Sequence, residues 1–170
     1  MLLISLLIFI CLGIICYQDM RYRAVSWVCF PLLAITMFAI KQQEAGWRET
    51  LIHCAGGLSF FGIQLFFLWF YISLKHRRFI NITSDCLGLG DILFLMAIAF
   101  YFSPVNYILF YTGSLIVVLI YTLVRRHFLK EPHYEIPLAG LQALLLSMLI
   151  MLSLANPNLK PYTDSWIYGL

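Results

Sequence analysis

The chain has 170 residues, of which 62% are hydrophobic and only 11% are charged, and its formal net charge is +3. Soluble domains carry about 25% charged residues, so this composition excludes an ordinary soluble protein and predicts an integral membrane protein. The small net charge gives no reason to expect nucleic acid as a partner.

Six apolar runs of spanning or near-spanning length follow one another along the chain. The fourth run is short for a full span, and the Ser103-Pro104 break after it predicts a tight hairpin or a kink. We therefore predict an all-α, polytopic protein with about six transmembrane helices in one domain over residues 1–155, followed by a short polar tail at 156–170. The runs are Leu2–Tyr17, Ala24–Ile40, Leu51–Ile72, Asp91 to just before Ser103, Val105–Val124 and Ile136–Ala155.

The positions of the basic residues predict how the runs cross the membrane. No basic residue precedes the first run, whereas Arg21 and Arg23 follow it, so the N-terminus is expected outside. With six spans, eight of the eleven Lys and Arg fall in cytoplasmic connections and three fall outside. The cytoplasmic set is Arg21, Arg23, Lys75, Arg77, Arg78, Arg125, Arg126 and Lys130, and the outer set is Lys41, Arg48 and Lys160.

Two aspartates stand at the edges of these apolar runs. Asp19 follows the first run, and Asp91 begins the fourth. In the six-span topology both lie at the cytoplasmic face and at similar depth, although they are far apart in sequence. Carboxylates at membrane depth are costly and are retained mainly where they have a function. Their shared depth indicates a pair.

A pair of carboxyl groups can hydrolyse a peptide bond, because one takes a proton from water while the other protonates the carbonyl oxygen or the leaving amine. Two such groups at short range share one proton. Gly88 and Gly90 permit close approaches and unusual backbone conformations before Asp91, and they place Asp91 at a helix N-terminus, which favours a carboxylate. We therefore assign Asp91 as the base and Asp19 as the protonated partner.

Each aspartate also has a simpler interpretation. Asp19 alone is typical of a polar residue that ends a helix and pairs with Arg21 or Arg23. The stretch Gly88–Asp91 alone is typical of a loop with a helix cap. These readings stay open for each residue taken by itself.

The whole pattern resembles the type IV prepilin peptidases and preflagellin peptidases, the membrane aspartyl proteases of the G-x-G-D type. Asp19–Val25 resembles the family's first conserved aspartate and the basic stretch that follows it. Gly88–Asp91 resembles the family's G-x-G-D motif, and Asp85 resembles the acidic residue that many members carry upstream of it. Ile136–Gly140 resembles the Ile-Pro start of a late helix in the family. The resemblance covers most of the chain.

The resemblance implies a peptidase of the short, peptidase-only form, with Asp19 and Asp91 as catalytic residues. Its partners would be a prepilin-like protein substrate, cut at the junction of a basic leader and an apolar helix, and membrane lipid. The location would be a bacterial or archaeal cytoplasmic (inner) membrane. Arg21, Arg23 and Asp85 are candidates for contact with substrate or lipid, and Glu131 and Glu135 are further acidic candidates for the leader.

The chain departs from the family pattern at two places. Family members usually have Pro-Asn where this chain has Ser26-Trp27, and often have a lysine where it has Leu93. A catalytically degenerate member, or another non-enzymatic membrane assembly or transport protein, is therefore the alternative function. A transporter more often places polar residues near the bilayer midplane in repeated halves, and no internal repeat is visible.

No metal or organic cofactor is expected. The four histidines have no metal-ligand spacing, and the chain contains neither H-E-x-x-H nor G-x-S-x-G. The five cysteines include no C-x-x-C pair and lie mostly within apolar runs, where small packing residues are the expected interpretation. The oligomeric state is not indicated by the sequence.

Overall fold

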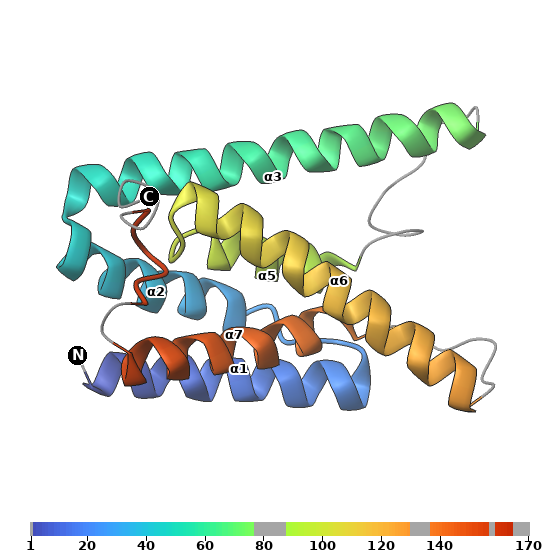
Figure 1. Cartoon of the computed structure of the whole chain (residues 1–170), viewed down its shortest axis with the longest axis horizontal. Helices are drawn as coiled ribbons and strands as arrows, with labels where there is room; N and C mark the ends of the chain where they lie inside the picture. Colours follow the sequence, from blue (N-terminus) through green and yellow to red (C-terminus); the bar gives the residue numbers. More distant parts are fainter. Residues whose placement is uncertain (1, 77–87, 130–136, 157–158, 165–170) are drawn as a thin grey trace.

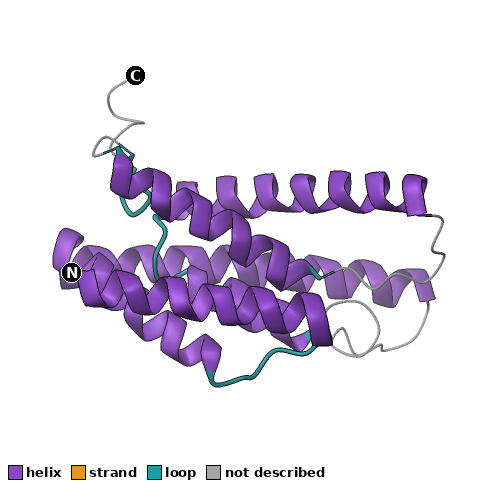
Figure 2. Ribbon diagram, turned by 90° about the horizontal axis from the view of Figure 1, so that it is seen from below, coloured by secondary structure: helices purple, strands orange, loops and turns teal. Residues whose placement is uncertain are grey.

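In the computed structural model the chain forms a bundle of helices, coloured along the sequence in Figure 1. The structure describes residues 2–76, 88–129, 137–156 and 159–164. Within these ranges there are six helices and no strand, as the purple ribbons of Figure 2 show. The helices are α1 (Leu2–Tyr22), α2 (Cys29–Ala45), α3 (Trp47–His76), α5 (Leu89–Ile98), α6 (Pro104–Leu129) and α7 (Leu138–Ala155). The predicted all-α class is confirmed over these residues.

The helix boundaries follow from local chemistry. An apolar chain in lipid must satisfy its own backbone hydrogen bonds, and a helix does so within one segment. Gly46 separates α2 from α3 with a φ of 79°, a conformation that glycine adopts without strain. Pro104 opens α6 and Pro137 directly precedes α7, because a proline near the first turn gives up no helix hydrogen bond.

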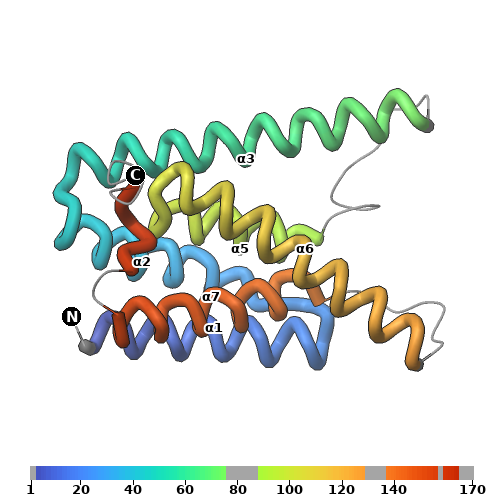
Figure 3. Tube along the Cα trace, in the orientation of Figure 1, coloured from blue at the N-terminus to red at the C-terminus, as the bar shows by residue number. Residues whose placement is uncertain are grey.

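Successive helices run in opposite directions, which can be followed along the tube in Figure 3. α7 packs most extensively against α1, while α2 packs between α1 and α5, and α3 packs with α6. The end of α1 and the beginnings of α5 and α7 therefore lie at the same end of the bundle (Figure 1). The described part of the C-terminal segment lies at the other end.

The core is formed where α1, α2, α5 and α7 meet. Ile15, Leu33, Phe94, Ala143 and Leu146 are completely shielded from solvent. Burial of such side chains is worth about 1.5–3 kcal/mol each for the larger ones in water. In lipid, however, tails are as apolar as leucine, so close packing supplies more of the stabilisation.

Among the described residues, four stretches are long and apolar enough to cross a membrane, namely Leu3–Tyr22, Cys29–Lys75, Pro104–Phe128 and Leu138–Ala155. The second of them contains both α2 and α3. α5 has 10 residues and is about 15 Å long, half of the roughly 30 Å hydrocarbon core. The predicted count of six spans and the outward N-terminus stay predictions.

Two boundaries differ from those expected, with consequences for polar residues. α1 continues to Tyr22, so Asp19 and Arg21 lie within its last turns instead of after the helix. α2 begins later and ends later than its apolar run, at Ala45. Lys41 therefore lies inside a helix and not in a connection.

Candidate active site

Asp19 and Asp91 both bind the beginning of α7. The backbone N–H of Gly140 donates a hydrogen bond of 2.6 Å to Oδ2 of Asp19. The preceding N–H, that of Ala139, donates one of 2.9 Å to Oδ1 of Asp91. Two residues distant in sequence thus bind consecutive residues of a third helix.

Three elements bring these groups together. Asp19 lies near the end of α1, the helix against which α7 packs most extensively. Asp91 lies in the first turn of α5, where its backbone N–H donates to the Gly88 carbonyl at 3.1 Å. The first N–H groups of any helix lack partners within that helix, so the start of α7 offers donors that the two carboxylates accept.

The two carboxylates lie close to each other. Consecutive backbone nitrogens are less than about 4 Å apart, so the two oxygens that bind Ala139 and Gly140 are at most about 10 Å apart. The charge of Asp19 acts on Asp91. Asp19 is 8% exposed and Asp91 is partly buried, so the pair lies at the edge of the packed interior.

Positive charge and helix polarity surround the pair. The N-terminal end of a helix carries a partial positive charge that favours a carboxylate, and both carboxylates meet α7 at that end. The charge of Arg23 acts on Asp19, and Arg23 adopts a φ of 54° just after α1. Arg21 instead lies exposed, 5.9 Å from the ring of Tyr17 and 5.7 Å from that of Tyr22.

The two motif glycines do not use unusual backbone conformations. Gly88 has a φ of −62°, and among the described residues only Arg23 and Gly46 have positive φ. The close approach expected of Gly88 is present, because a Cβ there would lie 3.1 Å from Oδ2 of Asp91. At Gly90 a Cβ would meet only Phe30, at an ordinary 3.7 Å.

Three acidic residues that the sequence suggests for contact with substrate or lipid lie outside the described residues. They are Asp85, Glu131 and Glu135. Within the described ranges, no three His, Cys, Asp or Glu side chains gather so as to hold a metal ion.

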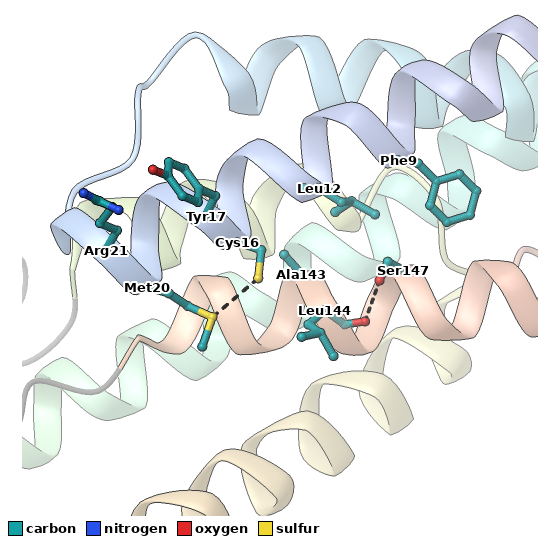
Figure 4. A pocket seen from close by; sticks show the side chains of 10 residues that line it. Phe9, Leu12, Cys16, Tyr17, Met20, Arg21, Ala143, Leu144 and Ser147 are labelled. Carbon is teal, nitrogen blue, oxygen red and sulfur yellow. Dashed lines mark hydrogen bonds between the residues drawn. The ribbon is translucent and has the colours of Figure 1, made fainter.

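A groove of about 700 Å³ runs along α1 and α7, as Figure 4 shows, and its lining includes neither Asp19 nor Asp91. Cys16 and Met20, which flank Asp19 on α1, line one end of the groove. Phe9 and Ser147 line the other end, about 16 Å away along α1. The lining is mostly apolar, and Gly13 leaves it open, since a Cβ there would meet nothing within 4 Å.

The sequence did not predict Ala139 and Gly140 as partners of the aspartates. It indicated a helix start at Ile136–Gly140, and the unpaired N–H groups of that start were a usable signal. Two further things were needed and were missing: the pairing of α7 with α1, and the small size of residue 140.

Comparison with known proteins identifies one family. Residues 6–123, more than half of the chain, match the model of the type IV leader peptidase family. No curated protein and no solved structure matches the chain.

Proposed function

The chain belongs to the type IV leader peptidase family, and we propose that it is a membrane aspartyl endopeptidase that removes the leader of prepilin-like precursors. One observation carries the proposal: the carboxylates of Asp19 and Asp91 bind consecutive N–H groups of α7. Family membership supports a peptidase, and the adjacent carboxylates support an aspartic mechanism.

The proposed reaction uses the two carboxyl groups with one shared proton. The ionised carboxylate takes a proton from water as the water oxygen attacks the carbonyl carbon of the scissile bond. The protonated partner gives its proton to the carbonyl oxygen. The tetrahedral intermediate then collapses: one carboxyl group gives its proton to the amine nitrogen as the C–N bond breaks, and the other carboxylate takes a proton from a hydroxyl of the intermediate as the new carboxyl group forms. Because each carboxylate accepts one N–H from α7, the roles of base and acid are exchangeable within a cycle.

The groove along α1 and α7 supports a substrate with an apolar helical segment. It begins beside Asp19, and most of its lining residues are apolar. A substrate helix lying there would present the peptide bond at its end to the two carboxylates. The leader on the other side of that bond would extend away from the membrane interior.

We place the reaction at the cytoplasmic face of a cytoplasmic membrane. The alternating directions of the described helices put Asp19 and Asp91 at the end opposite to the beginning of α1 (Figure 3). An outward N-terminus, which the distribution of Lys and Arg favours, would then put the pair at the cytoplasmic end.

The test is cleavage of a co-expressed pilin-like precursor by the wild type, Asp19→Asn and Asp91→Asn at matched expression. Asparagine keeps the size and can still accept from α7, but it cannot exchange protons in the same way. We expect each variant to lose at least about 100-fold in cleavage rate. Asp164→Asn, at the other end of the bundle, is the matched control and should cut normally.

The same assay separates the enzyme from its alternative. If the wild type cuts and either variant cuts equally well, the assigned residue is not catalytic. If the wild type leaves a panel of pilin-like precursors intact, the chain is a degenerate family member, for which the departures at Leu93 and Ser26-Trp27 would account. A cleavage rate that rises and falls with pH through two acidic limbs would further support a carboxylate pair.

A further inference from the structure

Gly140 occupies a position where even one methyl group would meet Asp19. A Cβ at residue 140 would lie 3.0 Å from Oδ2 and 3.1 Å from Cβ of Asp19, and 3.4 Å from the Cys16 carbonyl oxygen. Gly13, Gly62 and Gly113 also lie within helices, yet a Cβ at any of them would meet nothing within 4 Å. Gly140 is also buried, and it lies beyond the family-matched residues 6–123.

We propose that Gly140 is a positioning residue that sets the location of the Asp19 carboxylate relative to Asp91. Its N–H holds one oxygen of Asp19, and its missing side chain leaves room for that carboxylate against α7. The catalytic part of this inference rests on the proposed function, whereas the positional part does not.

The atoms around Gly140 determine how the protein would accommodate a methyl group at residue 140. Two of the three close atoms belong to the Asp19 side chain, and the third is backbone of α1. A side chain can move toward another rotamer at small cost, whereas the packed backbones of α1 and α7 resist displacement. A methyl group at residue 140 would therefore move the carboxylate of Asp19 away from α7, and the contact with Cβ of Asp19, which the backbone of α1 fixes, would be relieved by a separation of α1 and α7 of a few tenths of an ångström.

Asp91 would keep its position under the same change. Its oxygen binds the N–H of Ala139, and none of the three atoms nearest to a Cβ at residue 140 belongs to Asp91. The spacing of the two carboxylates would change while the rest of the site is preserved. Misplacement of a catalytic group by about 1 Å can reduce a rate by about 100-fold.

The first experiment compares Gly140→Ala with the matched control Gly113→Ala. We expect the Gly140 variant to lose about 10-fold to 100-fold in kcat with little change in KM, because the groove is untouched. The control should keep both constants. A loss confined to KM, or an equal loss in both variants, would overturn the positioning role.

The second experiment needs no cleavage. A hydrophobic carbodiimide activates a carboxyl group, and an added amine then forms an amide that mass spectrometry locates. We expect Asp19 to be labelled severalfold faster in Gly140→Ala than in the wild type or Gly113→Ala, with Asp91 as the internal reference. An unchanged Asp19 rate would overturn the proposal even if cleavage fell, and a changed rate would support it even if the wild type cut no precursor.

A third variant covers the case in which Gly140→Ala does not fold. Asp19→Ala removes the carboxylate oxygen that a Cβ at residue 140 would meet at 3.0 Å. In a double-mutant cycle, Asp19→Ala should restore part of the thermal stability that Gly140→Ala loses, because alanine removes the oxygen but keeps the Cβ of residue 19. If the double variant is as unstable as the single one, the strain lies with the helix backbones and the positioning role is wrong.

Discussion

At one end of the bundle two carboxylates accept hydrogen bonds from the start of a helix, whereas at the other end a lysine is buried. We call the first, formed by Asp19, Asp91, Ala139 and Gly140, the aspartate end. The lysine end is formed by Lys41, Phe102, Ser103, Asn106, Pro161, Thr163 and Asp164. Lys41 is completely buried, and its Nζ donates a hydrogen bond to the Phe102 carbonyl.

At the lysine end, residues 161–164 form hydrogen bonds with Ser103 and Asn106. The Ser103 backbone N–H donates to the Pro161 carbonyl at 3.2 Å, and the Ser103 hydroxyl donates to Oδ1 of Asp164. The side-chain amide of Asn106 donates to the carbonyls of Pro161 and Thr163 at 3.1 and 2.9 Å. These contacts join the turn before α6 to residues near the end of the chain.

The difference between the ends is one of donors and exposure. At the lysine end, side-chain donors match carbonyl and carboxylate acceptors, and Lys41 and Ser103 are fully buried. At the aspartate end each carboxylate has about four acceptor positions, of which α7 uses one, and Asp91 is partly exposed. The lysine end is therefore suited to stability, and the aspartate end to binding and exchanging protons.

The largest difference between the two ends is expected for Lys41→Met, which keeps most of the length of the side chain but removes its donor. The Phe102 carbonyl would be left without this partner, at a cost of about 1–3 kcal/mol. We expect a lower melting temperature but an unchanged cleavage rate per folded molecule. Asp19→Asn should show the opposite pattern. Loss of activity in the folded Lys41 variant would mean that the two ends are coupled.

Filling the groove tests whether the precursor binds along α1 and α7. A Cβ at Gly13 would meet nothing within 4 Å, so the side chain of Gly13→Leu would begin in the open space of the groove between α1 and α7. We expect KM for the precursor to rise about 10-fold with kcat unchanged, the result of lost substrate binding alone. Gly62→Leu on α3, equally open, is the control, and a matching rise in KM there would argue against the groove.

The smallest expected effect belongs to Ser103→Ala at the lysine end. The change removes one hydroxyl donor from Asp164, worth about 1 kcal/mol, and should lower the melting temperature by about 2–4 °C. Cleavage should be unchanged. A melting temperature identical to that of the wild type would show that the C-terminal segment contributes no stability through this contact.

The sequence predicted the partners at the aspartate end only in part. Asp19 and Asp91 could be paired because the asymmetry of basic residues ordered the helices and placed both residues at one end. Gly140 could not be paired with them, since a helix start in the sequence indicates unpaired N–H groups but not which side chains those groups will bind. Its small side chain gains meaning only once α1 and α7 are known to pack together.

The lysine end was missed for a different reason. Lys41 follows an apolar run, so it was assigned to an outer connection, and the C-terminal segment was treated as a tail. In the structure α2 continues past Lys41. A long aliphatic stem allows a lysine to be buried when its amine finds an acceptor, and that acceptor belongs to a turn 61 residues away.

The shortness of α5 has a consequence for the chain beyond residue 155. A helix of 10 residues is about 15 Å long, so the chain that follows it would turn inside a hydrocarbon core of about 30 Å, where each unpaired backbone group would cost several kcal/mol. In the described residues, Lys41 donates to the Phe102 carbonyl and the Ser103 N–H donates to the Pro161 carbonyl. Residues 159–164 therefore supply, from within the protein, a hydrogen-bond partner that lipid would not provide.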